Sequence, residues 1–402
     1  MRFSLRAVHV HHGISPHAGE WAEFCHRLCR RHAVPLHVAV ADLAPHRAHG
    51  LEAAARRARY QLLAGEDADF VVLAHHRDDQ AESLLLQLLR GAGPAGLAGM
   101  PLQRELSGSR ASLLRPLLEV SRGEIAAFAR ERELEWIEDE SNADTQRARN
   151  FIRLRVLPLL EERYPAARAT IARSAGHLGE AEEMLAALAR IDLAPLERDE
   201  SIDGEGLRRL GGARAKNVLR YISRKRGVAP PPAARIEEFW RQLLAARAGA
   251  AVCVDLPGWQ FRVHLGRVYF ERRRTPPPPD YREIWGGEGT LPLLALGGVL
   301  RFKPEEGRGV SAARLRRAEV TVRVRRGGER LQPDGRRPRR TLKNLLLEHR
   351  IPPWRREHLP CLYCGDELVS VPGIGDDCAW QAAKGEPGLI ITWEWLDPVG
   401  QR

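Results

Sequence analysis

Several features are scarce or absent in this chain of 402 residues. Its longest near-unbroken apolar stretch, residues 291–300, is well short of the roughly 20 residues that a membrane-spanning helix needs. A signal peptide would need an apolar stretch near the start, where "VHVHHG" places histidines instead. Six cysteines are too few for a disulfide framework and suit a reducing compartment. We therefore expect a cytoplasmic protein with no membrane partner.

The cysteines also give little support for a zinc site. Cys25 and Cys29 recur at helical spacing in "EWAEFCHRLCRRH", so they are expected to face the core. Cys361 and Cys364 form a single CxxC, which only Cys378 follows, whereas a structural zinc site usually needs a second close pair or suitably spaced histidines. Packing is therefore the expected role of Cys25 and Cys29, and zinc is not expected at Cys361 and Cys364.

Lysine is rare, with only five among 63 basic residues, yet the formal net charge is +11 and the sequence pI is about 9.8. Such a charge favours a polyanionic partner, most simply nucleic acid. An arginine bias can also reflect genomic base composition, so the placement of the charges must decide. Twelve basic residues against three acids fall between Arg323 and Arg356. This concentration predicts a surface that follows RNA phosphates.

The tail sequence also predicts how that surface is built. In "VTVRVRRGGER" the valines alternate with polar residues, which predicts a strand with one basic face. A helix capped by Thr341 should follow, with Leu342, Leu345 and Leu346 packed inward. Trp354 either stacks on a base or anchors packing. The predicted RNA-binding residues are Arg323, Arg325, Arg336, Arg337, Arg339, Arg340, Lys343 and Trp354.

Short apolar strands alternate with helices from Leu5 to about Leu160. This order predicts an α/β fold with a doubly wound, mostly parallel sheet, whose ligands bind at the carboxyl ends of the strands. A mainly helical domain and a small α+β C-terminal domain should follow. The expected boundaries are 1–185, 186–275, 276–309 for a linker with connecting strands, and 310–402.

The stretch "LAHHRDDQAESLLLQLLRG" at 73–91 joins a predicted strand to a predicted helix. Helical spacing brings Asp78, Asp79 and Glu82 to one side of the first turn, where like charges repel unless something lies between them. The acids could simply cap the helix N-terminus. Their position at a strand end favours instead a divalent metal, with Asp78 and Asp79 as Mg²⁺ ligands, or a bound ammonium group.

Histidines accompany these acids at two predicted strand ends. His9, His11 and His12 close the first strand, with His9 and His11 on one face, and His75 and His76 precede the acids. Two such clusters at neighbouring strand ends indicate a functional site rather than chance.

Six strings, in order, resemble the tRNA(Ile)-lysidine synthetase family, and the tail from "GGERLQPDGRRPRRTLKNLLLEHRIPPW" onward resembles that family's C-terminal domain. The strings are "HVHHGIS" (9–15), "GLEAAARRARY" (50–60), "LAHHRDDQAES" (73–83), "RGAGPAGLAGM" (90–100), "LLRPLLEVSRGEI" (113–125) and "WIEDESNADTQRARNFIRLRVLPLL" (136–160).

The resemblance implies an N-type ATP pyrophosphatase domain joined to tRNA-binding domains, and a possible homodimer. Such enzymes adenylate C2 of the wobble cytidine in the isoleucine tRNA with a CAU anticodon, and the side-chain amine of free lysine then displaces AMP. It implies ATP, Mg²⁺ and L-lysine as ligands and Asp78, Asp79 and Glu82 as catalytic residues. The implied ATP and lysine ligands are His9, His11, His12, His75, His76, Arg115, Arg122, Arg149, Asn150 and Arg153.

One family motif is not found in this sequence. The family carries an S-G-G-x-D-S loop, upstream of the segment that matches "LRAVHVHHG", whose amides hold the ATP pyrophosphate. Without it the sheet would lack an inner strand. We expect the loop to be encoded upstream of Met1; the alternative is a non-catalytic tRNA-binding remnant. A tRNA cytidine thiolase is a further alternative, although its chemistry usually relies on cysteines near the nucleotide.

Overall fold

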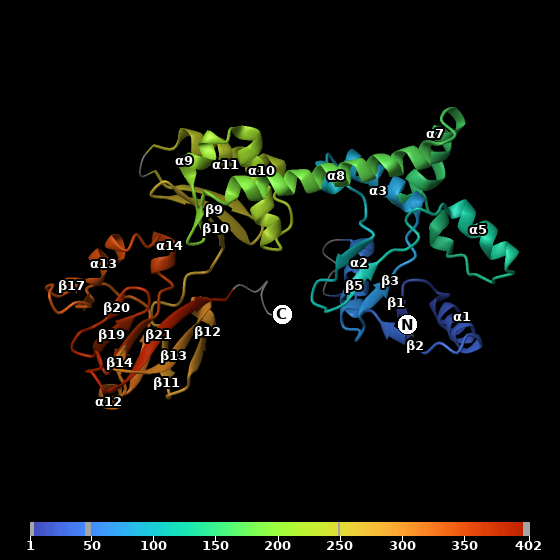
Figure 1. The fold of residues 1–402 in the computed structure, drawn as a ribbon. Coiled ribbons are helices and arrows are strands. Elements are labelled where there is room, and N and C mark those ends of the chain that lie inside the picture. The colour runs from blue at the N-terminus through green and yellow to red at the C-terminus, as the bar shows by residue number, and fades with distance from the viewer. Residues whose placement is uncertain (1–3, 45–49, 248–249, 397–402) are drawn as a thin grey trace. The chain divides into compact units, whose positions relative to one another are not determined.

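The computed structural model describes residues 4–44, 50–247 and 250–396. The chain forms two compact units, Met1–Leu185 and Ala186–Arg402, and the long helix α8 (Ala167–Leu193) passes from the first into the second. Figure 1 shows the elements of each unit. Within the described residues, no helix is long and apolar enough to cross a membrane.

The N-terminal unit alternates strands and helices. Its strands are β1 (Ala7–His11), β2 (Leu36–Val40), β3 (Phe70–Val72), β4 (Gln103–Glu105) and β5 (Ser112–Leu114). Its helical segments are α1 (Ala18–Arg31), α2 (Leu51–Ala64), α3 (Arg77–Leu89), α4 (Pro94–Leu97), α5 (Arg122–Glu131), the 3₁₀ turn η2 (Glu140–Ala143), α6 (Ala148–Phe151), the π-helical turn η3 (Ile152–Val156), α7 (Leu157–Arg163) and the start of α8.

The expected doubly wound sheet is confirmed only in part, because the unit is α/β but its strands form two small sheets. β1 pairs in parallel with β2 alone, while β3 pairs in parallel with β5, which pairs antiparallel with β4. Among the described residues, no strand joins β1 to β3 through backbone hydrogen bonds. Side-chain packing bridges the two small sheets instead, because Val8 of β1 packs on the buried cluster that contains Val71 and Leu113. The unit is therefore α/β with parallel pairing in two small sheets.

Local sequence explains the helix that follows β3. α3 begins after His76, and its first turn forms a capping box in which the Asp79 carboxylate accepts the His76 backbone N–H at 3.0 Å. It ends at Leu89, and Gly91 follows two residues later with a φ of 72°, which suits a residue without a side chain. Ala81 and Leu84 are buried and anchor the helix in the interior of the unit. Its first turn lies next to the end of β3.

The first part of the second unit contains more sheet than the predicted, mainly helical domain. Its elements are β6 (Glu197–Arg198), β7 (Ser201–Asp203), α9 (Gly204–Arg209), α10 (Gly212–Lys225), α11 (Ala233–Ala245), β8 (Val252–Leu256), β9 (Trp259–His264) and β10 (Arg267–Arg272). The strands form one sheet in the order β6-β7-β10-β9-β8, and α9, α10 and α11 lie on one of its faces (Figure 1). The rings of Phe239, Phe261 and Phe270 pack at a tilt and join helices to sheet, with ring centroids 4.9 and 4.8 Å apart.

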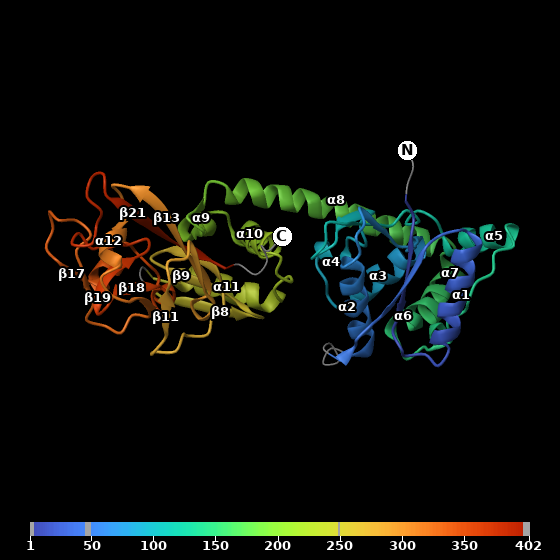
Figure 2. The same ribbon diagram turned by 90° about the horizontal axis from the view of Figure 1, so that it is seen from below.

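The rest of the unit is α+β, in agreement with the expected C-terminal domain. It contains β11 (Arg282–Trp285), β12 (Thr290–Leu293), η4 (Leu294–Leu296), β13 (Gly298–Glu306), β14 (Val310–Ser311), α12 (Ala312–Leu315), β15 (Val320–Arg323), β16 (Arg330–Leu331), β17 (Arg340–Thr341), α13 (Leu342–Glu348), α14 (Pro353–Arg356), β18 (Cys361–Cys364), β19 (Glu367–Val371), β20 (Gly375–Asp376) and β21 (Pro387–Trp395). Figure 2 shows the long strands β13 and β21, which pair along their whole length. The predicted connecting strands, 276–309, are thus integral to these sheets.

The predicted strand with one basic face is buried on both faces. β15 lies between β11 and β18, and Thr321, expected to face outward, is fully buried. The valines pack into one core cluster, while Tyr363, which pairs with Thr321, packs against a second cluster that includes α13. The guanidinium of Arg323 lies 4.7 Å from the centre of the Tyr363 ring. Arg323 therefore packs against this ring and does not form part of an open basic surface.

Candidate active site

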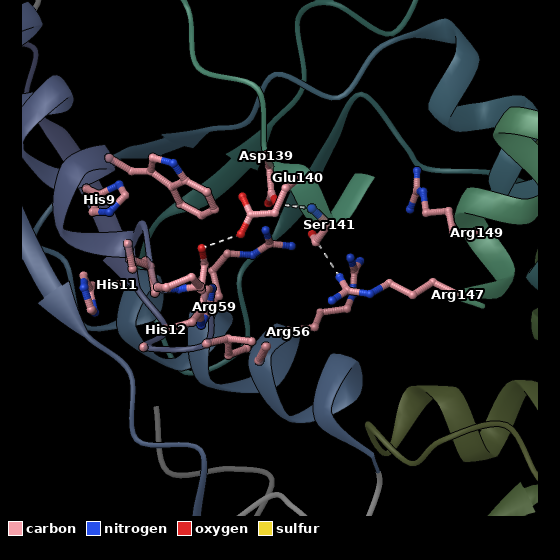
Figure 3. A pocket seen from close by; sticks show the side chains of 18 of the residues that line it. His9, His11, His12, Arg56, Arg59, Asp139, Glu140, Ser141, Arg147 and Arg149 are labelled. Carbon is pink, nitrogen blue, oxygen red and sulfur yellow. Dashed lines mark hydrogen bonds between the residues drawn. The ribbon is translucent and has the colours of Figure 1, made fainter. Parts of the chain in front are cut away.

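A cleft of about 710 Å³ lies at the carboxyl ends of β1 and β3. Four segments line it: the end of β1 with the loop and the first turn of α1 after it, α2, the β3–α3 junction, and the chain from Asp139 through η2 into η3. Figure 3 shows labelled side chains from three of these segments. The lining residues that carry or can acquire charge are His9, His11, His12, Arg56, Arg59, His75, Asp79, Asp139, Glu140, Arg147, Arg149 and Arg153.

The charges of the cleft favour an anionic ligand. Five arginines line it against three carboxylates. Arg59 lies partly buried, burial lowers the pKa of its guanidinium, and its Nε has no hydrogen-bond partner among the described residues. Because arginine presents several N–H donors in a planar fork, an unpaired guanidinium in a cleft suits phosphate oxygens.

The histidines that end β1 add neutral hydrogen-bonding groups. Burial is the main cause that lowers the pKa of both His9 and His12 below the usual value, which leaves them uncharged at neutral pH. The buried Nδ1 atoms of His11 and His12 lack a hydrogen-bond partner in the part of the chain that the structure describes. Buried polar atoms without partners cost free energy, so a ligand that pairs with them would be stabilised.

His75 lies on the cleft wall between the acids and the core. Burial lowers the pKa of His75 to about 4. Its Nδ1 accepts a hydrogen bond from Nε of Arg115 at 3.2 Å. Arg115 itself is only 2% exposed and donates through Nη1 to the carbonyl oxygen of Pro101 at 2.8 Å. Arg115, a predicted ligand, therefore does not line the cleft.

Asp79 and Glu82 are held by two arginines. Arg149 donates from Nε to Glu82 at 2.7 Å and from Nη2 to Asp79 at 2.8 Å. Arg153 donates to both oxygens of Glu82, at 2.6 and 3.0 Å. Glu82 is fully buried, and its hydrogen bond is the main cause that raises the pKa of Arg153. The network joins α3 to the segment formed by α6 and η3.

The three carboxylates do not converge as predicted. Asp78 faces away from Asp79: it accepts the backbone N–H of Arg122 at 3.3 Å and pairs with Arg168 at 3.4 Å. It lines a second, smaller cavity of about 440 Å³ with Arg122, while Asp79 lines the main cleft. The predicted Mg²⁺ site on Asp78 and Asp79 does not fit this geometry, because the two carboxylates line different cavities and each pairs with an arginine. Within the described residues, no cluster of three or more His, Cys, Asp or Glu could hold a metal ion.

Other predicted ligands have structural roles. The amide of Asn150 donates to the carbonyl oxygens of Ser141 and Asp144, at 2.8 and 3.0 Å, and so orders the loop that carries η2. The Nε2 of His76 lies 3.5 Å from Asp79 at the start of α3, and His76 does not line the cleft.

Sequence reasoning missed several residues of the site. The cleft lining includes five residues that the sequence analysis did not name as ligands: Arg56, Arg59, Asp139, Glu140 and Arg147. All five lie within the segments 50–60 and 136–160, which carry the family resemblance. The Ser15 hydroxyl donates to Glu140 at 2.7 Å, and Arg147 donates to the Ser141 hydroxyl at 3.2 Å (Figure 3). Arg56 and Arg59 are three residues apart on a helix that follows a strand, a spacing that could have indicated a shared face.

Comparison with known proteins identifies the family of this chain. A PP-loop domain matches residues 1–160, a TilS substrate binding domain matches 203–269, and a TilS substrate C-terminal domain matches 320–395. A tRNA(Ile)-lysidine synthase of Nitrosomonas europaea is 44% identical over 98% of this chain and 86% of its own length. This chain belongs to the tRNA(Ile)-lysidine synthase family. Relatives in Ralstonia nicotianae and Aromatoleum aromaticum are 39% and 40% identical, over 96% and 98% of this chain and 87% and 91% of theirs.

Every residue that lines the cleft falls within the PP-loop match of this lysidine synthase family member. Likeness to solved structures is weaker: a U34-tRNA thiolase from Methanococcus maripaludis covers 44% of this chain and 63% of its own, with 17% identity and a TM-score of 0.37. So low a score carries no argument about this chain.

The predicted RNA-binding residues of this family member differ in what they contact. Arg325 lies 3.8 Å from Glu329, Arg337 lies 3.8 Å from Asp334, Arg339 lies 2.6 Å from Asp377, and Arg340 pairs with Glu348. Arg336 and Lys343 are exposed and form no side-chain hydrogen bond or ion pair with the described residues. These two side chains are available for phosphates.

Trp354 packs within the second unit. Its ring lies 5.6 Å from that of Tyr269 and 5.9 Å from that of His264, and the guanidinium of Arg262 lies 4.8 Å from its centre. The next residue, Arg355, pairs with the buried Glu271 at 2.6 Å. These contacts favour the packing anchor over the base-stacking alternative.

We predict that Arg153→Met destabilises the N-terminal unit by about 2–3 kcal/mol, because Glu82 loses two of its three hydrogen bonds while it remains buried. Urea unfolding followed by tryptophan fluorescence measures this. Arg155→Met is the matched control, since Arg155 is exposed on the same helical segment and should change stability by less than about 0.5 kcal/mol. Equal effects of the two changes would contradict the role of the ion pairs.

We also predict a pH dependence that comes from His75. Its pKa is about 4 in the folded chain and 6.5 without the environment of the fold, so between these values the unfolded chain binds a proton that the folded chain does not. As the pH is lowered from 6.5 to 4, the free energy of unfolding should therefore decrease. This group contributes at most about 1.4 kcal/mol per pH unit to the decrease. Thermal unfolding should show a shallower decline for His75→Gln than for the unchanged protein. Parallel curves would contradict the lowered pKa.

Proposed function

We propose that this chain joins the side-chain amine of free lysine to C2 of the wobble cytidine in the isoleucine tRNA with a CAU anticodon, and uses ATP to activate that carbon. The carrying observation is the arginine-lined cleft at the strand ends, which lies inside the PP-loop match of a chain 44% identical to a protein named tRNA(Ile)-lysidine synthase. In the first step the cytidine O2 attacks the α-phosphate of ATP and pyrophosphate leaves. In the second step the lysine amine attacks C2, and AMP leaves with O2.

The arginines of the cleft would hold the triphosphate. Arg56 and Arg59 approach from α2, and Arg147 approaches from the segment after η2. Phosphate oxygens would pair with these donors and with the unpaired nitrogens of His11 and His12. Charge that develops on the transferred phosphoryl group is stabilised by donors fixed before the reaction begins. We assign no step to Mg²⁺.

Asp79 is the carboxylate best placed to meet the lysine ammonium. It lines the cleft, and each of its oxygens accepts one protein hydrogen bond, from His76 and from Arg149, which leaves lone pairs for an ammonium. Glu82 is fully buried and accepts three hydrogen bonds from arginines, so we infer that it positions Arg149 and Arg153. Asp79 would then accept the proton that the amine loses as it attacks C2. Asp78 remains a candidate in the smaller cavity.

The function is tested by incubating the chain with ATP, labelled lysine and a CAU-anticodon isoleucine tRNA transcript. Lysine incorporation with release of AMP supports the ligase. Binding of tRNA without incorporation would favour the non-catalytic alternative, and sulfur transfer from a supplied donor would favour the thiolase. The thiolase has little structural support, because Cys361 and Cys364 are buried in the C-terminal cores, outside the unit that contains the cleft.

We predict that Asp79→Asn lowers kcat/KM for lysine transfer by about 100-fold or more, because asparagine keeps the size of the side chain but cannot neutralise or deprotonate an ammonium group. Steady-state incorporation of labelled lysine measures this. Glu119→Gln is the matched control, since Glu119 is an exposed acid of the same unit. Near-normal transfer by Asp79→Asn would remove Asp79 from the mechanism.

A second prediction concerns the tRNA. Changing both Arg336 and Lys343 to Gln should weaken tRNA binding and reduce the slope of log K against log salt concentration by about 1 to 2, because each free cation that meets a phosphate releases about one counterion. Filter binding over a range of salt concentrations measures the slope. Arg308→Gln is the control, because Arg308 is exposed but paired with Glu305 at 2.7 Å. An unchanged slope for the double variant would place the tRNA on another surface.

A further inference from the structure

Arg115 joins three parts of the N-terminal unit from a buried position. It follows β5 directly and is only 2% exposed. It donates to the carbonyl oxygen of Pro101 and to Nδ1 of His75. Its charge also acts on Tyr60 of α2: burial raises the pKa of Tyr60, but the positive charges of Arg56, Arg104 and Arg115 lower it overall. A buried guanidinium without partners would strongly destabilise the fold, so these contacts are what allow Arg115 to be buried.

The hydrogen bond between Arg115 and His75 has one chemical reading. A guanidinium has only donors, so Nδ1 of His75 must be the acceptor and carry no proton. A protonated ring would turn an N–H toward an N–H of a cation. Burial acts in the same direction, since it lowers the pKa of His75 to about 4. The ring at neutral pH is thus uncharged, with its single proton on Nε2.

The ring of His75 lines the main cleft, and Arg115 occupies Nδ1, so Nε2 is the nitrogen that remains for a ligand. The cleft around it carries Arg56, Arg59 and Arg149, which favour phosphate oxygens. A neutral N–H donor among these cations adds a directed hydrogen bond without adding charge. It also cannot serve as a general base at that nitrogen.

We propose that Arg115 is a positioning residue that holds His75 neutral with its proton on Nε2, and that His75 thereby donates a hydrogen bond to a phosphate oxygen in the cleft. The phosphate part rests on the proposed function, whereas the position of the proton does not. Arg115, implied as a ligand by its sequence context, acts through His75 instead.

The proton position is measured directly by nitrogen NMR of the protein with ¹⁵N-labelled histidine at pH 7. The His75 signals are those that disappear in His75→Gln. We expect one protonated Nε2 and one unprotonated Nδ1. A proton on Nδ1, or on both nitrogens, would overturn the proposal whatever the activity.

The role of Arg115 is tested in the same spectrum. In Arg115→Met the second tautomer of His75 should become detectable, because the hydrogen bond that requires an unprotonated Nδ1 is then lost. Arg208→Met is the matched control: Arg208 also donates to backbone carbonyl oxygens, of Leu243 and Ala246, but lies in the other unit. It should leave the His75 signals unchanged. A single Nε2–H tautomer in Arg115→Met, in a protein that remains folded, would overturn the positioning role.

The donor role is tested with two amide substitutions. The glutamine amide of His75→Gln can reach the place of Nε2, whereas the shorter asparagine amide of His75→Asn reaches only the place of Nδ1. ATP binding by equilibrium dialysis should be about tenfold tighter for His75→Gln than for His75→Asn, the size of one hydrogen bond to a charged oxygen. Equal ATP affinities would overturn the donor role. A chain that binds ATP in this pattern yet never incorporates lysine would refute the proposed ligase and leave this inference standing.

Discussion

The site depends on one buried carboxylate. Glu82 has no exposed surface, and its three hydrogen bonds come from Arg149 and Arg153. Neither partner could be removed cheaply, because a buried charge without its counter-ions is strongly destabilising. The pairing fixes α3 against the segment of α6 and η3 and thereby sets where Asp79 and Arg149 stand on the wall of the cleft. Four separate segments line the cleft, and this contact holds two of them, the β3–α3 junction and the chain from η2 into η3, in fixed positions relative to each other.

The cleft combines cations with neutral donors. Burial removes charge from the histidines, while the arginines keep theirs, so the ligand meets fixed positive charge together with hydrogen-bonding groups that add none. The cleft also carries three negative charges among these positive ones. They come from Asp139 and Glu140 at the start of η2 and from Asp79 of α3. Such a mixture can hold an anion and a cationic nucleophile near each other, which a uniformly basic pocket could not do.

Local patterns in the sequence predicted most elements near the site. The strand end at His11, the cap of α13 by Thr341 and its packed leucines were correct, because they follow from short-range spacing. The direction of Asp78, the burial of Arg115 and the ion pairs of Glu82 were not accessible, since each depends on residues tens of positions away. The face of Arg323 was misjudged for a similar reason: alternation in one strand cannot show that both faces of a sheet are covered.

The π-helical turn η3 restricts how this chain can vary in length. Arg149 and Arg153 reach the same carboxylate from positions four residues apart, across the point where α6 passes into η3. Inserting or deleting one residue between them would rotate one guanidinium by about 100° around the helix axis, away from Glu82. Surface loops tolerate such changes, because their entropy depends only weakly on length. The contact with Glu82 therefore fixes the number of residues between these two arginines.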